Sequence, residues 1–281
     1  MVHETSAAGS AQARETAGLE REAIRAARAV LSLARHTLVD AFRERAFRGL
    51  SLFLLVLLGV ARLIGPLALG EGRRITLDVG LTLITLFGLF LILTLGTRSV
   101  QKEVEQKTIL MLLARPVRRG EFVLGKFFGS VAVVATGLSG MLAILAGVLL
   151  LSGYEFNGSL AVAGYYAFLE LVIVSALSML LTVFTSPVLA AFFLLGLFVA
   201  GHLAPSLLEM ARLLPGGAAA RALESLLLVV PRLDLYRYGA EVVHGIRAPA
   251  SQVAWATLYA GLYSAAALLL GILAFRRREF S

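Results

Sequence analysis

Six stretches of mostly apolar residues, each long enough to cross a lipid bilayer, constrain the fold of this chain more than any other feature. A transmembrane helix needs roughly 20 such residues. Backbone amides in hydrocarbon must find partners within their own segment, so these stretches predict helices rather than open sheets. The composition, 58% hydrophobic and 16% charged, agrees with an all-α integral membrane protein. The predicted spans are about 47–69, 75–96, 127–151, 160–184, 187–208 and 252–275.

Two different segments precede the first span. Residues 1–18 are small and polar and lack the apolar core of a signal peptide, so we expect a disordered cytoplasmic tail and an uncleaved first span. Residues 19–46 carry apolar side chains at steps of three and four, with arginines on the opposite side. This pattern predicts an amphipathic elbow helix lying among the lipid headgroups, and packing on another protein is the alternative.

The distribution of positive charge predicts the orientation. Eighteen of the 26 Lys and Arg residues lie before residue 49, in the loop 98–126, or at 276–278, whereas seven lie in the opposite loops. Cytoplasmic loops of membrane proteins collect such residues, so both termini are expected in the cytoplasm and the segment 209–250 outside. The same rule accounts for the net charge of +8, and no nucleic-acid partner is expected.

The charged stretch between the second and third spans reads EVEQKTILMLLARPVRRGEFVLGK over residues 103–126. Glu103 and Lys107 stand four apart in the order that favours a helix, and Pro116 would end that helix. We expect a short cytoplasmic helix over about 100–114, a basic turn at Gly120, and a return to the membrane near Lys126. An ordinary positively charged loop is the alternative interpretation.

One segment of this stretch imitates a nucleotide-binding loop. Gly120, Gly125 and Lys126 have the spacing of a phosphate-binding loop, but Phe127 stands where a Ser or Thr would hold magnesium. No apolar strand precedes the glycines. The chain is therefore expected to be no enzyme by itself and to hold no cofactor or metal, and any nucleotide would be bound by another subunit.

Polar residues inside the predicted spans form the second candidate site. Glu170 lies near the centre of the fourth span, with Tyr165 and Tyr166 about one turn before it. An ionisable group at that depth costs several kcal/mol and often marks a function. It would line a pathway, join two subunits, or be neutral and bonded within one subunit. His202 in the fifth span is expected to bond a neighbouring helix, with Pro205 bending that span.

The stretch from Glu105 to Lys126, with TI, LL, ARPVRR and F..GK in order, resembles the cytoplasmic segment of ABC-2 type transporter permeases. The subgroup includes permeases of nitrous-oxide-reductase maturation and gliding motility. This chain has Lys107 where that pattern commonly has Gly. The resemblance extends to the elbow helix, the six spans, PRLDLYRYGAEVVHG at 231–245 and FRRREF at 275–280.

The resemblance implies a function for the cytoplasmic helix. In that family it is the coupling helix that docks on a separate ATPase subunit, which binds ATP and magnesium. The family also implies a second permease chain, identical or different, and export across a prokaryotic inner membrane. Carried over by position, the coupling residues are Glu103, Glu105, Lys107, Thr108, Arg115, Pro116 and Arg119.

Two other functions remain open from the sequence. A secondary transporter would use Glu170 and His202 as a proton relay and would need no ATPase. Alternatively, the chain would relay the force of an ATPase to an extracytoplasmic protein without moving a solute. The chemical nature of the substrate is not encoded in any motif described above.

Overall fold

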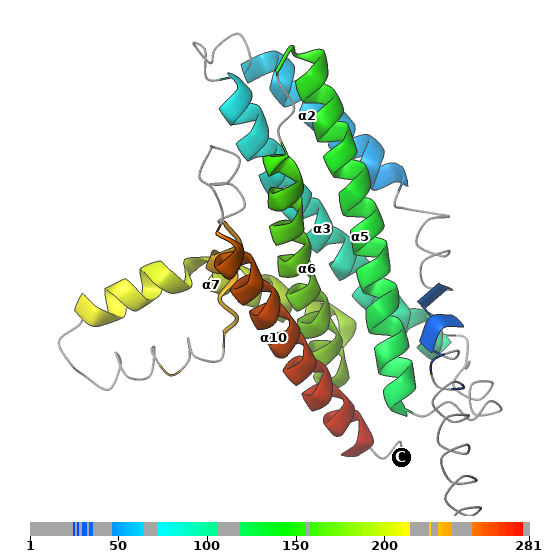
Figure 1. The fold of residues 1–281 in the computed structure, drawn as a ribbon. Coiled ribbons are helices and arrows are strands. Elements are labelled where there is room, and N and C mark those ends of the chain that lie inside the picture. The colour runs from blue at the N-terminus through cyan, green and yellow to red at the C-terminus, as the bar shows by residue number, and fades with distance from the viewer. Residues whose placement is uncertain are drawn as a thin grey trace, which may run out of the picture.

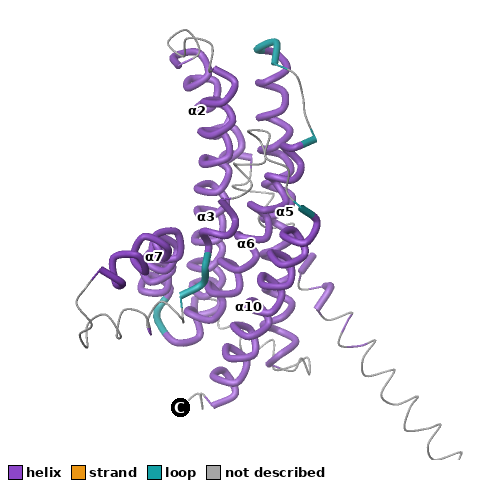
Figure 2. The backbone as a smooth tube through the Cα atoms, turned by 60° about the vertical axis from the view of Figure 1, so that its left-hand side comes forward, coloured by secondary structure: helices purple, strands orange, loops and turns teal. Residues whose placement is uncertain are grey.

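The computed structural model is all-helical in the part of the chain that it describes, and Figure 2 shows helices joined by loops there. The expected tail over 1–18 lies outside this part, as does most of the expected elbow helix over 19–46, whose few described positions are helical. The described ranges are 47–64, 72–105, 119–154, 158–213, 230–237 and 249–277, with isolated positions at 25, 27, 30–32, 34, 35 and 225.

Five of the described helices are long and apolar enough to cross a membrane, which confirms five of the six predicted spans. The first predicted span coincides with α2, which is described from Phe47 to Ile64 and is not among the five. The residues after Ile64 lie outside the described part. The five spans are Gly72–Leu95 in α3, Val123–Leu151 in α5, Ser159–Phe184 in α6, Pro187–Met210 in α7 and Ala250–Ala274 in α10.

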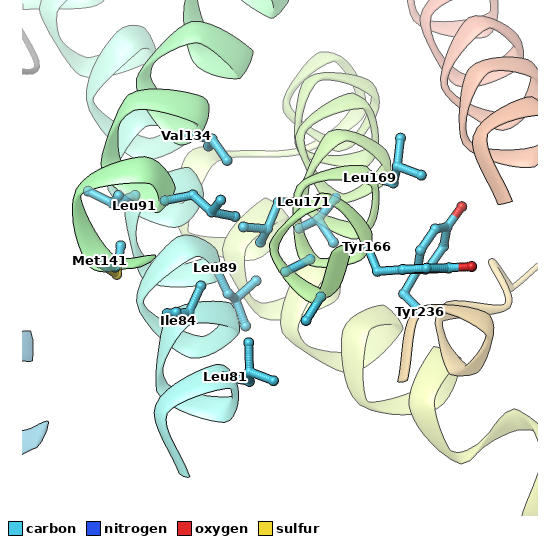
Figure 3. Packing of buried hydrophobic residues seen from close by; sticks show 14 of the residues in the cluster. Leu81, Ile84, Leu89, Leu91, Val134, Met141, Tyr166, Leu169, Leu171 and Tyr236 are labelled. Carbon is cyan, nitrogen blue, oxygen red and sulfur yellow. The ribbon is translucent and has the colours of Figure 1, made fainter. Parts of the chain in front are cut away.

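Helix α6 (Ser159–Phe184) is the centre of the bundle. About 61% of its spanning window is buried within the chain, against 22% for α7 (Pro187–Leu213). It contacts α3, α5, α7 and α10 (Ala250–Arg277), and the largest apolar cluster spreads from it to these neighbours. Figure 3 shows Leu169 and Leu171 of α6 among the packed side chains of this cluster. Side chains on α6 are therefore more buried within this chain than those on α7.

Two short connections fix how successive helices turn back. After α5, Gly153 has φ 78°, a left-handed conformation that glycine adopts without strain, and the Tyr154 N–H donates to the Leu149 carbonyl at 3.0 Å. Between α6 and α7, Thr185 is extended and Pro187 opens the next helix. Proline suits a first helical position because its missing N–H needs no partner there. The two helices are thus joined by a tight link at Thr185 and Ser186.

The boundaries around the charged stretch differ from those expected. Helix α3 runs without a break from Gly72 to Glu105, so residues 100–105 end this helix and do not begin a separate one. Helix α5 begins at Arg119 and ends at Leu151, so the turn expected at Gly120 is wrong. A single glycine costs a helix only about 1 kcal/mol, and the Lys, Glu and Gln residues nearby favour helix. Residues 106–118 lie outside the described part.

The helices alternate in direction, so the start of α5 and the C-terminal end of α10 lie at the same end of the molecule (Figure 1). Helix α7 contains Pro205, and its yellow C-terminal part projects away from the bundle in Figure 1. Between α7 and α10 the chain forms the short 3-10 helix η3, Leu233–Arg237. This segment lies against α6 and α7.

Candidate functional site

Glu170 lies inside the bundle, with only 4% of its surface exposed. Its position on α6 places it about 21 Å along the helix axis from Phe184, at 1.5 Å per residue. The hydrocarbon core of a bilayer is about 30 Å thick, so the carboxyl group lies well within it for an upright helix. A carboxyl group in such a place must be neutral or closely paired.

The partner of Glu170 is His202 of α7, in the same chain. The His202 Nε2 atom is 3.2 Å from Glu170 Oε1, a close approach whose geometry falls short of a full hydrogen bond. The other ring nitrogen, Nδ1, is 3.0 Å from the carbonyl oxygen of Phe198, one turn earlier on α7. His202 thus lies close to the neighbouring helix α6 through Nε2 and bonds its own helix through Nδ1.

The surroundings of the two ring nitrogens determine where protons can be. A carbonyl oxygen only accepts hydrogen bonds, so Nδ1 carries a hydrogen directed at Phe198. With one further proton, on the carboxyl group or on Nε2, the pair of Glu170 and His202 has no net charge. A low-dielectric interior favours that state.

The two neighbouring tyrosines have different partners, because consecutive residues point about 100° apart on a helix. The Tyr165 hydroxyl lies 2.9 Å from the Thr257 hydroxyl of α10 and is partly exposed. Tyr166 is buried, and its ring lies edge-on to the ring of Tyr236, with 6.4 Å between centroids (Figure 3). Tyr166 therefore joins the buried polar site, whereas Tyr165 lies at its edge against α10.

Tyr236 belongs to a segment that we call the strap, residues Val230–Arg237. The Tyr236 hydroxyl donates to the carbonyl oxygen of Ala256 on α10 at 2.9 Å, and Leu233 is fully buried. Burial raises the pKa of the Tyr236 phenol, which keeps this donor protonated. At the start of the strap, the Arg232 N–H donates to the Tyr259 hydroxyl at 3.0 Å. The strap is thus fixed to α10 at two points.

The strap also fits closely against α7. A Cβ atom at Gly201 would lie 2.7 Å from the Pro231 carbonyl oxygen and 2.9 Å from Leu233, so only glycine permits this approach. Gly201 directly precedes His202 in the sequence. Arg237 and Tyr236 are close enough to interact electrostatically with His202 and Glu170, respectively. The strap therefore lies beside the buried pair.

Sequence reasoning did not single out Gly201, Tyr236 or Tyr259 as parts of this site. The run PRLDLYRYG attracted notice only through its family resemblance, and a lone glycine in an apolar span has many uses. The available signal was the tyrosine between charged residues in an otherwise apolar chain. Its partner on α10 could not be inferred from that signal.

The expected coupling residues lie elsewhere. Glu103 and Glu105 occupy the last turn of α3, which continues ten residues beyond the end of its span at Leu95, a length of about 15 Å. Arg119 is the first residue of α5. The other four expected residues, Lys107, Thr108, Arg115 and Pro116, lie outside the described part of the chain. The segment that carries the expected coupling residues therefore lies between two long helices, α3 and α5.

These features define a multi-pass helical membrane protein with a buried polar pair and a charged connection between two of its helices. The family model described as ABC-2 family transporter protein matches residues 5–280. The chain therefore belongs to the ABC-2 transporter family, whose members are the membrane subunits of ABC transporters and not the ATPase itself. A comparison with curated proteins returned no match.

Proposed function

We propose that this chain is the permease subunit of an ATP-driven exporter in a prokaryotic inner membrane, of the kind found in nitrous-oxide-reductase maturation and gliding motility. The observation that carries this proposal is the family match over residues 5–280. A separate ATPase subunit binds ATP and magnesium. A second permease chain completes the transporter.

The proposed contact with the ATPase is the segment between α3 and α5, which includes Glu103, Glu105, Lys107, Thr108, Arg115, Pro116 and Arg119. The helical ends on both sides support this placement, because α3 continues to Glu105 and α5 begins at Arg119. A continuous helix transmits a displacement along its axis without a hinge. Closure of the ATPase pair on ATP would then move α3 and α5 together and switch the packed helices between two arrangements.

The test uses charge reversal on the proposed contact. Glu105→Arg should lower the amount of ATPase subunit recovered with the purified permease by at least about tenfold, because like charges across an interface cost more than the 1.4 kcal/mol that a tenfold change requires. The matched control is Glu209→Arg, an exposed glutamate on α7 at the opposite end of the spans. Equal recovery of the ATPase with both variants would contradict the proposed contact.

One structural observation favours a second candidate function. The paired Glu170 and His202 could carry a proton through a secondary transporter. That function requires solute movement driven by a pH gradient in vesicles that contain the permease alone. Transport that instead requires a hydrolysis-competent ATPase would reject it, and ATP hydrolysis coupled to an extracytoplasmic protein without solute movement would favour force relay.

A further inference from the structure

The strap, residues Val230–Arg237, is a partly buried non-α segment between two membrane spans. Its Leu233 is fully buried, and Tyr236 is 3% exposed. Helical rise gives its depth, because Ala256, which accepts from Tyr236, lies about 27 Å along α10 from the end of the span at Ala274. The strap therefore reaches the outer boundary of a hydrocarbon core about 30 Å thick.

Glu170 lies deeper than the strap. It is about 21 Å from the corresponding end of α6, so about 6 Å separate the two levels. Tyr166, one turn before Glu170, contacts the strap through the ring of Tyr236. Anything moving from the buried pair toward this end of the molecule between α6, α7 and α10 would meet the strap first.

The contacts of the strap come from three helices. Tyr166 belongs to α6, Gly201 to α7, and Ala256 with Tyr259 to α10. These contacts are one ring packing, one close backbone approach, two hydrogen bonds and the apolar packing of Leu233. None of them is part of the backbone hydrogen bonding of a span. A helix shift that changes the distance between α7 and α10 would disturb both sides of this fit.

We propose that the strap closes the outer end of the transport pathway in this subunit, and we call this role the seal. The contact between Glu170 and His202 positions α7 against the strap. The contact joins α6 to α7 one residue from Gly201, so its loss removes one restraint on the helix against which the strap packs. This role rests on the proposed transport function and on the expected orientation. It gives Glu170 and His202 a positioning function.

The chain contains no cysteine, so a single introduced cysteine is the only thiol that a maleimide can label. Ala260 lies one turn beyond Ala256 on α10, toward the end of the helix at Arg277, and is 1% exposed. Ala260→Cys therefore places a thiol beneath the strap with a small change in volume. Its reaction with a membrane-impermeant maleimide, added separately to right-side-out and inverted vesicles, measures access from each side of the membrane.

Gly201→Ala is the critical perturbation. The added methyl group would meet the Pro231 carbonyl oxygen at 2.7 Å, so the strap must move away from α7. The matched control is Gly196→Ala on the same helix, where a Cβ atom meets nothing within 4 Å. Both substitutions are made in the chain that carries Ala260→Cys. We expect its thiol to react about tenfold faster from the outer side with Gly201→Ala than with Gly196→Ala.

A second variant covers the case in which Gly201→Ala does not assemble. Tyr236→Phe removes the hydrogen bond to Ala256, and labelling should rise about threefold, with Tyr154→Phe as a control away from the strap. Equal labelling of Gly201→Ala and Gly196→Ala, or rapid outer labelling of the chain that carries Ala260→Cys alone, would overturn the seal. No ATPase enters this measurement, so failure of the seal is distinct from failure of the ATP-driven function.

Discussion

The contact between Glu170 and His202 makes a quantitative prediction about the coupling of two helices. Glu170→Met removes the carboxyl group and leaves His202 Nε2 without its partner. His202 has 25% of its side chain exposed, so part of its hydration is recovered, and the cost should be about 1 kcal/mol. His202→Leu instead leaves the 4%-exposed Glu170 unpaired, which should cost about 2 kcal/mol or more.

The double variant is the informative one. Replacing both members of a buried polar pair by apolar groups of similar size is often nearly neutral. We therefore expect the pair of substitutions at Glu170 and His202 to cost no more than about 1 kcal/mol, which gives a coupling free energy of about 2 kcal/mol. Hydrogen bonds between membrane helices average only about 0.6 kcal/mol. The expected coupling free energy is larger because Glu170 is a buried ionisable group.

The assay is reversible unfolding of the four proteins in mixed micelles, with the free energy of unfolding compared around the cycle. Substitutions that do not interact add within about 0.5 kcal/mol. Additive costs for Glu170→Met and His202→Leu would therefore show that the 3.2 Å contact contributes nothing, and the positioning role would fail with it. A matched pair on exposed faces, Leu189→Ala with Leu262→Ala, should be additive.

Three further predictions concern the core, the strap and the proton of the pair. Leu171→Ala, at a fully buried position on α6, should lower the free energy of unfolding by about 3 kcal/mol, whereas Leu270→Ala on the exposed face of α10 should change it little. The raised pKa of Tyr236 means that its stabilisation is complete below pH about 10 and is lost only above it. Melting temperatures of the parent and of Tyr236→Phe should therefore run parallel from about pH 6 to 9 and converge at higher pH. Glu170→Gln should preserve transport if the pair only positions α7, because the amide N–H can donate to His202 Nε2, and should abolish transport in an intact complex if the carboxyl group carries a proton.

The spans could be predicted because hydrophobicity averaged over about 20 residues is a strong signal in a chain with few charges. The five confirmed spans begin and end within a few residues of the predicted limits. The interpretation of Gly120 failed for a different reason, since a glycine preceded by Arg118 and Arg119 was interpreted as a turn. The structure places Gly120 within the first turn of α5, where the helix has already begun at Arg119.

The start of the cytoplasmic helix was also misplaced. The helix-favouring residues of the charged stretch predicted a separate helix beginning near residue 100, although α3 continues to Glu105 without a break. Helix preference shows that a stretch is helical and contains no information about where the preceding helix ends. Residues 97–105 contain neither glycine nor proline, so nothing in that interval ends the helix of the second span.

The pairing of Glu170 with His202 was only partly accessible from the sequence. The tight link at Ser186 makes α6 and α7 antiparallel neighbours, so residues equally distant from it lie at equal depth. Glu170 is about 21 Å before the end of α6, and His202 is about 22 Å after the start of α7. Depth was therefore predictable from this link. Whether the two side chains face each other depends on the rotation of each helix about its axis, which the packing of α6 against α3, α5 and α10 decides. The position of the strap is harder still to predict from the sequence. Tyr236 follows Leu213, the end of α7, by 23 residues, and no periodicity in that interval specifies the helix to which its hydroxyl group donates.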